Sequence, residues 1–220
     1  ILDLSKIEAG KMTIDLVPLD LRRLLSETEA LMQVKARSRG IDLHITLDTA
    51  VPAVVTGDAV RVRQILVNLI GNAIKFTEAG SVAVRVSFSS QPKPLITIRV
   101  VDSGIGMSRE QMSRLFGAFE QADSGTTRRF GGTGLGLSIS RHLAIRLGGD
   151  IAVESEQGRG STFTFTLPTA PDIGSPMIGP TALLSSIVEA PVPAADSAQG
   201  LPLSGLRIYF AEDGPDNQRL

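Results

Sequence analysis

Phe130-Gly131-Gly132-Thr133-Gly134-Leu135-Gly136-Leu137 is the stretch that says most about the fold, because it places four glycines within six residues. Such a run forms neither a good helix nor a good strand, since each glycine loses much conformational entropy when it is fixed. The residues that follow, from Ser138 to Leu147, have the pattern of a helix. A glycine loop that leads into a helix N-terminus leaves backbone N–H groups free, and the helix dipole favours anions there. The stretch therefore predicts a loop that binds phosphate.

The composition is that of a globular protein and excludes several classes of function. Of the 220 residues, 42% are hydrophobic and 20% are charged, and the formal net charge is −1. This near-neutral charge gives no sign of binding to nucleic acid or to an acidic membrane surface. The lack of cysteine excludes disulfides and thiolate metal sites and fits a reducing compartment. No apolar run approaches the roughly 18 residues of a transmembrane helix, so we expect no membrane contact by these residues.

Three helices are predicted upstream of the glycine run. One lies between residues 21 and 40 and the next follows Asp58, a good N-cap residue, and runs to about Phe76. Ser108 and Gln111 form a capping box for a short helix to about residue 116. The first helix carries apolar positions spaced by three and four residues, at Leu21, Leu24, Leu25, Thr28, Leu31 and Met32.

Alternating apolar residues predict strands between these helices and after the glycine run. The strands are expected at about 41–47, 82–88, 95–101, 151–155 and 161–167. Strands and helices do not follow a regular βαβ order, so the pattern predicts an α+β fold, a two-layer α/β sandwich, and not a doubly wound sheet.

Two asparagines, Asn68 and Asn72, are spaced four residues apart and so lie on the same face of the second predicted helix. Asparagine is a mediocre helix former, and an unmatched amide facing a core is costly, so packing does not explain the pair. Amide oxygens at this spacing can complete the shell of a magnesium ion held by nucleotide phosphates. Lys75, one turn further on, is placed to neutralise a phosphate. The alternative is that both asparagines bond to neighbouring loops.

Asp102 ends an apolar strand and is followed by Ser103-Gly104-Ile105-Gly106. This order puts one carboxylate at the mouth of the sheet, and the glycines allow a flat group to lie close to the backbone. The carboxylate can accept a hydrogen bond from an exocyclic amine such as that of adenine. An ordinary Asx-turn is the alternative.

Two further features flank the predicted phosphate loop. Phe116 and Phe119 are three residues apart, which fits core packing or the anchor of a mobile segment. Arg128 and Arg129 stand directly before the glycine run, where they form either a solvated charge pair or a group that neutralises a terminal phosphate.

Taken in order, these motifs resemble the catalytic ATP-binding domain of sensor histidine kinases, which belongs to the GHKL ATPase superfamily. The matching motifs are Asn-x-x-x-Asn-x-x-Lys-Phe, Asp-x-Gly-x-Gly, Phe-x-x-Phe, Gly-Gly-Thr-Gly-Leu-Gly-Leu and Gly-x-Gly-Ser-x-Phe. The resemblance covers roughly residues 19–168 and implies the GHKL (Bergerat) type of two-layer sandwich, with ATP and Mg²⁺ as ligands.

The resemblance implies roles for the matching residues at the two ends of the nucleotide. Asn72, helped by Asn68, would hold magnesium, and Lys75 would touch phosphate. Phe76 would line the adenine side. Asp102 would bind the adenine amine, with Thr162 supporting it through water.

The same resemblance implies a lid over the nucleotide at about residues 121–133. Phe116 and Phe119 would anchor this lid, and Arg128 or Arg129 would meet the γ-phosphate. The remaining residues expected to shape the ATP site are Gly104, Gly106, Gly132, Thr133, Gly134, Leu135 and Gly136.

Residues outside the catalytic domain imply a longer parent chain. Residues 1–18 resemble the end of the second dimerisation helix of sensor histidine kinases, and residues 169–205 read as a proline-rich linker. Residues 206–220, with the acidic pair Glu212-Asp213, are similar to the start of a truncated receiver domain. We therefore expect a fragment of a hybrid sensor kinase, a homodimer whose first dimerisation helix carries the acceptor histidine. That helix is absent here, and neither His44 nor His142 stands in an acceptor context.

The expected function is therefore that of a protein-histidine kinase in two-component or phosphorelay signalling. The chain would bind Mg-ATP and donate the γ-phosphoryl group to a histidine supplied by the dimerisation helix, in the cytoplasm, with any membrane anchor in the rest of the parent. Two alternatives stand beside it. One is a degenerate module that binds nucleotide or a partner without transfer, and the other is a different GHKL ATPase.

Overall fold

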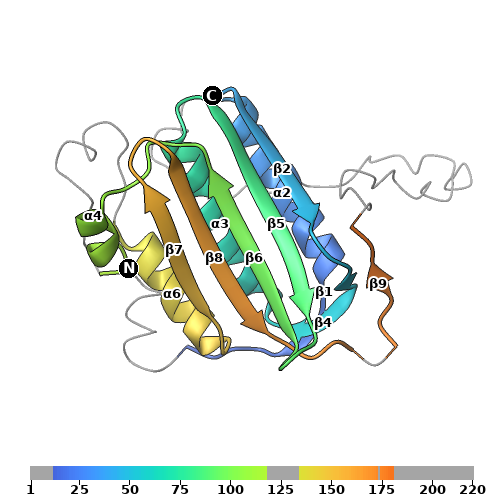
Figure 1. The fold of residues 1–220 in the computed structure, drawn as a ribbon. Coiled ribbons are helices and arrows are strands. Elements are labelled where there is room, and N and C mark those ends of the chain that lie inside the picture. The colour runs from blue at the N-terminus through green and yellow to red at the C-terminus, as the bar shows by residue number, and fades with distance from the viewer. Residues whose placement is uncertain (1–11, 118–133, 173, 181–220) are drawn as a thin grey trace, which may run out of the picture. The chain divides into compact units, whose positions relative to one another are not determined.

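Five strands form one mixed sheet in the order β2-β5-β6-β8-β7 (Figure 1). The structure is a computed structural model and describes residues 12–117, 134–172 and 174–180. Strands β2 and β5 are parallel, and the other neighbours are antiparallel. The five strands span Ile41–Leu47 (β2), Gly80–Ser89 (β5), Leu95–Asp102 (β6), Asp150–Glu156 (β7) and Gly160–Pro168 (β8).

Three helices cover one face of this sheet, as Figure 1 shows: α2 (Leu21–Arg37), α3 (Ala59–Phe76) and α6 (Gly136–Arg146). Alternate strand residues point toward the helices and are buried, with Phe165 among the largest side chains that are fully buried. The residues between them, such as His44 and Arg99, lie on the other face and are exposed. This two-layer arrangement confirms the predicted α+β sandwich.

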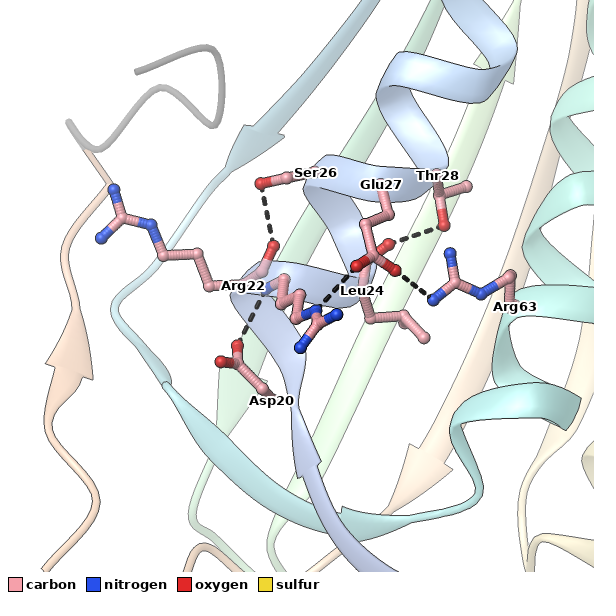
Figure 2. Close-up of polar contacts among 8 residues, drawn as sticks. Asp20, Arg22, Leu24, Ser26, Glu27, Thr28 and Arg63 are labelled. Carbon is pink, nitrogen blue, oxygen red and sulfur yellow. Dashed lines mark hydrogen bonds and ion pairs between the residues drawn. The ribbon is translucent and has the colours of Figure 1, made fainter. Parts of the chain in front are cut away.

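Helix α2 begins after Asp20, whose Oδ1 accepts a hydrogen bond from the N–H of Arg23 at 2.8 Å (Figure 2). Glu27 accepts from Arg23 on its own helix and from Arg63 on α3, and so joins the two helices. Such partly exposed ion pairs contribute little, so the apolar face of α2 provides most of its stability. Leu31 was expected on that face but is 56% exposed, because it lies at the far edge of the apolar stripe.

Helix α3 begins where the sequence predicted, at the N-cap residue Asp58. Oδ1 of Asp58 accepts from the N–H groups of Val60 and Arg61, each at 3.1 Å, and Oδ2 accepts from the N–H of Asp15 at 3.1 Å. The carboxylate therefore satisfies two of the donors that a helix N-terminus leaves open. Helix α3 packs between α2 and α6 and carries the polar residues of the predicted site.

The chain does not leave the domain at Pro168, where a linker was expected to begin. The short strand β9 (Met177–Ile178) pairs with β3 (Val51–Pro52), and Thr169 donates its hydroxyl to the carbonyl oxygen of Thr56 at 2.6 Å. A second unpredicted pair joins β1 (Val17–Asp20) to β4 (Val54–Gly57). The packed part of the domain therefore extends at least to Ile178.

The capping box at Ser108 is present, and it begins the short helix α4 (Arg109–Arg114), slightly shorter than expected. Helix α6 begins earlier than expected, at Gly136. The dimerisation-helix end was expected over residues 1–18, but residues 12–16 form neither helix nor strand and β1 begins at Val17, so the described part of that range contains no helix. Residues 1–11, the lid, most of the linker and the receiver start lie outside the described residues.

Candidate functional site

The last turns of α3 bring the predicted phosphate-end residues to one side of the helix. Asn68, Asn72 and Lys75 follow each other at spacings of four and three residues, so their side chains share a face. The buried face of α3 lies elsewhere and is formed by residues such as Leu69 and Ala73. The polar residues are therefore placed away from the core.

Asn68 connects α3 to the N-terminus of α6. Its Nδ2 donates to the hydroxyl of Ser140 at 2.9 Å. A Cβ added at Gly136 would lie only 2.5 Å from Oδ1 of Asn68, so a side chain at this position would push the Asn68 amide aside. The amide nitrogen of Asn68 is thus bonded to a neighbouring helix and not to a loop, while its oxygen lies near Gly136 in the first turn of α6.

The first turn of α6 has no side chain that caps it. The residue before the helix, Leu135, is buried at 4% exposure, and Gly134 has a positive φ of 69°. A positive φ is costly for residues other than glycine, so Gly134 makes the sharp entry into the helix possible. The glycine stretch thus produces the uncapped helix N-terminus that the sequence predicted.

The side-chain amide of Asn72 makes no hydrogen bond to any residue that the structure describes. Its amide oxygen and that of Asn68 are hard oxygen donors, the kind that magnesium prefers. In the described ranges no three His, Cys, Asp or Glu side chains gather as a metal site. The two amide oxygens are ligands of the kind that fits a magnesium ion held mainly by phosphates.

Lys75 lies in a cationic environment at the end of α3. Its Nζ is 4.7 Å from the centroid of the Phe76 ring. Burial lowers the pKa of the Lys75 ammonium, and the nearby charges of Lys35 and Arg39 lower it further. Arg39 also donates to the carbonyl oxygens of Ile74 and Lys75, at 3.1 and 2.8 Å. The three neighbouring positive charges of Lys35, Arg39 and Lys75 favour the binding of an anion.

Asp102 stands at the end of β6 and is 7% exposed. Its Oδ1 accepts from the N–H of Gly104 at 2.9 Å and from the N–H of Ser161 at 3.2 Å. The first contact is the Asx-turn that the sequence offered as an alternative, and the second adds a bond from β8. No donor from the described residues contacts Oδ2. Burial raises the pKa of this carboxyl, and the two N–H bonds act against that rise.

Glycines bring the backbone close around Asp102. A Cβ at Gly104 would lie 2.4 Å from the carbonyl oxygen of Phe76, and one at Gly106 would lie 2.0 Å from that of Glu156. The Phe76 carbonyl also accepts from the N–H of Ile105 at 3.2 Å, so the end of α3 is tied to the loop after Asp102. The two ends of the predicted site are thereby joined.

Thr162 does not lie beside Asp102, contrary to expectation. Asp102 is paired with Ser161 across the two strands, and Thr162 is paired with Val101. Neighbouring strand residues point to opposite faces, so Thr162 lies on the open face of the sheet and Ser161 on the helix side. The buried odd-numbered residues of β8, such as Phe163 and Phe165, could have indicated this from the sequence.

Phe116 is the one member of its phenylalanine pair that the structure describes. It packs against the core, and the guanidinium of Arg141 lies 4.8 Å from the centroid of its ring. Arg141 also forms an ion pair with Asp150. The other predicted residues of this region, Phe119, Arg128, Arg129, Gly132 and Thr133, lie outside the described residues.

Neither histidine contacts the residues of this site described above. His44 is exposed on the open face of β2. His142 lies on α6, with Nδ1 2.8 Å from the carbonyl oxygen of Ser138. Across the residues that the structure describes, no helix has the length and apolarity needed to cross a bilayer.

The arrangement can bind a ligand with an amine at one end and several negative charges at the other. Asp102 offers a buried acceptor beside a glycine-lined backbone, and Asn68, Asn72 and Lys75 offer oxygens and positive charge. From Asn68 to Phe76 the axis of α3 spans about 12 Å. These features fit a purine nucleotide with a phosphate chain.

Comparison with known proteins agrees with this arrangement. The chain is 46% identical over 170 residues to hybrid signal transduction histidine kinase B of Dictyostelium discoideum, covering 76% of this chain and 9% of that protein. The crystal structure of full-length ShkA in complex with AMPPNP has a TM-score of 0.67 at 33% identity, over 78% of this chain and 35% of that one. The catalytic domain of histidine kinase ThkA has a TM-score of 0.60 at 28% identity, over 71% of this chain and 97% of that domain.

The chain spans about a tenth of the length of the relative named first. The model of one family, described as histidine kinase-, DNA gyrase B-, and HSP90-like ATPase, matches residues 57–171, which include α3, the Asp102 loop, α6 and the β7–β8 hairpin. This chain therefore belongs to the family of histidine kinase-, DNA gyrase B- and HSP90-like ATPases.

Proposed function

We propose that this domain binds Mg-ATP and presents its γ-phosphoryl group to a histidine on the dimerisation helix of a hybrid sensor histidine kinase. The observation that supports this most strongly is the contact between the loop after Asp102 and the last turn of α3. The N–H of Ile105 donates a hydrogen bond to the Phe76 carbonyl, and Gly104 lies close to the same oxygen. Because of this contact, the buried carboxylate of Asp102 lies on the same side of the sheet as the end of α3 that carries the two asparagine amides and Lys75. The similarity to hybrid histidine kinases supports the transfer to histidine.

In this proposal Oδ2 of Asp102 accepts a hydrogen bond from the amino group of adenine. The N–H groups of Gly104 and Ser161 hold the carboxylate in place through Oδ1. Because the carboxylate is already oriented before binding, little ordering is needed when the nucleotide arrives. The absence of side chains at Gly104 and Gly106 lets the base lie near the backbone.

At the other end, Asn72 and Asn68 would hold magnesium through their amide oxygens, and Lys75 would contact the phosphates. Magnesium, when bound, neutralises charge on the phosphate oxygens and helps to orient them. The N–H groups of the first turn of α6, starting at Gly136, would point at the same phosphates. Phosphoryl transfer depends mainly on such positioning and neutralisation, so the domain needs no nucleophile of its own.

The parent is proposed to be a cytoplasmic signalling chain with its own receiver domain, which would begin near residue 206. The lack of cysteine fits that reducing compartment. The acceptor histidine would come from the dimerisation helices of a homodimer. The roles of Arg128, Arg129 and the lid remain part of the same proposal.

The experiment that tests this function is transfer from γ-labelled ATP. The chain is mixed with a dimerisation helix pair that carries the histidine, and a second mixture contains the same helices with that histidine replaced by glutamine. We expect label on the first helix pair only, stable to alkali and lost in acid, and no label on this chain. Nucleotide binding without any transfer would instead indicate a degenerate binding module.

A further inference from the structure

The hydroxyl of Ser155, on β7, joins three segments beside Asp102. It accepts a hydrogen bond from the N–H of Met107 at 2.8 Å and lies 2.9 Å from the carbonyl oxygen of Gly160 and 3.0 Å from the hydroxyl of Ser161. Met107 follows the loop after Asp102, whereas Gly160 and Ser161 begin β8. One side chain therefore ties that loop to both strands of the β7–β8 hairpin.

The chemistry of these partners determines which way each proton points. A serine hydroxyl has one proton to donate and two lone pairs that accept. The N–H of Met107 only donates and the carbonyl of Gly160 only accepts, so Ser155 gives its proton to Gly160 and a lone pair to Met107. The third contact then requires the Ser161 hydroxyl to be the donor. This is the arrangement that satisfies all three contacts at once.

The Ser161 hydroxyl, which lies on the residue paired with Asp102, consequently has only lone pairs left to offer and no proton. Its N–H donates to Oδ1 of Asp102, and the two residues are directly paired on the same face of the sheet. Ser161 is buried, at 9% exposure, so its hydroxyl has little access to bulk water. Oδ2 of the ionised Asp102 is an acceptor as well. These two side chains thus form an edge that carries acceptors only.

Such an edge distinguishes purines by the group at position 6 of the ring. Adenine carries an amino group there with two N–H donors, whereas a 6-oxo purine such as guanine carries an oxygen that only accepts. A hydroxyl that could turn freely would donate to that oxygen, either directly or through one water. A hydroxyl held as an acceptor cannot donate to this 6-oxo oxygen, which is then left unpaired. A buried polar group without a hydrogen-bond partner makes the binding free energy less favourable.

We propose that Ser155 is a positioning residue that holds the Ser161 hydroxyl as an acceptor and thereby contributes to the preference of the site for adenine. This inference rests on the proposed function, because it concerns the base of the same nucleotide. Ser155 acts on the base through Ser161, to which it is hydrogen-bonded.

The test compares the binding of Mg-ATP, whose base carries a 6-amino group, with that of Mg-ITP, whose base carries a 6-oxo group and a proton on the adjacent ring nitrogen. Ser155→Ala is expected to weaken ATP binding about three- to tenfold, as the loss of one or two hydrogen bonds implies, without weakening ITP binding. The preference for ATP, measured by calorimetric titration, then falls by a similar factor. Ser155→Thr keeps the hydroxyl and is expected to keep the wild-type preference. Ser89→Ala, an exposed serine at the end of β5, is the matched control.

A double-mutant cycle separates this role from a purely structural one. If Ser155 acts through Ser161, then Ser155→Ala changes the preference by less than about twofold when Ser161→Ala is already present. Equal losses for ATP and ITP in Ser155→Ala, or additive effects on the preference, would overturn the inference. If Ser155→Ala does not fold, an unchanged preference in Ser161→Ala overturns it instead. A wild-type chain that binds neither nucleotide would refute the proposed function and the inference with it.

Discussion

Replacing Asp102 by asparagine is expected to weaken Mg-ATP binding at least about 100-fold, because a charged acceptor is lost and a donor takes its place. The asparagine oxygen can still accept from the N–H groups of Gly104 and Ser161, so the loop keeps its shape. The amide nitrogen would then stand where Oδ2 stands and would present N–H groups to the adenine amine. Two donors facing each other leave both unpaired, which explains the size of the effect. Calorimetric titration measures the affinity directly.

The control for this substitution is Asp42→Asn, on the exposed face of β2, which is expected to bind ATP as the wild type does. The pH dependence supplies a second check. Burial raises the pKa of the Asp102 carboxyl, so wild-type affinity should begin to fall at a higher pH than for an ordinary aspartate, as the pH is lowered. The Asp102→Asn variant should lack this fall. An affinity within threefold of the wild type in Asp102→Asn would contradict the assigned role.

The same pKa shift determines the sign of the effect on stability. Because the pKa is raised in the folded protein, the contribution of Asp102 to stability is fully present below the unfolded pKa and is lost as the pH rises through the folded pKa. At neutral pH the buried charge therefore costs stability. Asp102→Asn should have a melting temperature equal to or above that of the wild type, which distinguishes lost binding from lost folding.

Gly160→Ala is expected to destabilise the domain by about 3–5 kcal/mol, which combines overpacking with a strained backbone. A Cβ at this position would lie 1.9 Å from the carbonyl oxygen of Asp102 and 3.0 Å from the Cα of Ser103. Both are backbone atoms of the loop that orients Asp102, so they cannot turn aside as a side chain would. Gly160 also has a φ of 103°, which residues with a side chain rarely adopt. Thermal unfolding should show a fall of roughly 10 °C or more.

The matched control is Gly158→Ala in the same hairpin. Gly158 has a φ of 81°, but no atom lies within 4 Å of an added Cβ. This variant therefore isolates the backbone strain, which we expect to cost about 1–2 kcal/mol. If the two variants were equally destabilised, the close approach of Gly160 to Asp102 would not be the cause.

The main helices and the strands of the large sheet could be predicted from the sequence because their signals are local. Asp58 and Ser108 cap the helices that they were expected to cap, and the alternation in 41–47 matches the buried and exposed residues of β2. Leu31 was misplaced because a spacing rule does not define the edge of the contact between α2 and its neighbours.

The short strands could not be predicted, because their partners are distant in the chain. Strand β9 contains two residues and follows Pro176, and its partner β3 includes Pro52, so both lack the usual pattern of a strand. Their pairing depends on backbone hydrogen bonds between segments separated by more than a hundred residues. No local preference encodes such a pairing, and a proline-rich segment therefore read as a linker.

The candidate site was predictable where its residues belong to local motifs, and not where they depend on strand register or on contacts between distant segments. Asn68, Asn72, Lys75 and Asp102 each belong to a local motif, and the structure joins their two elements through Phe76 and Ile105. The choice between Ser161 and Thr162 depends on which residue is paired with Asp102, and this register was not read from the sequence. The role of Ser155 depends on three segments meeting, which only the folded chain shows.

Nucleotide is expected to bind between the Asp102 loop and the polar face of α3. Amide chemical-shift mapping during a titration with Mg-AMPPNP tests it most directly. We predict the largest shifts at the backbone N–H groups of Gly104 and Ser161 and at the side-chain amides of Asn68 and Asn72, with little change at Thr97 and Thr164 on the open face of the sheet. Shifts concentrated on that open face, with none at Gly104 or Asn72, would contradict the account.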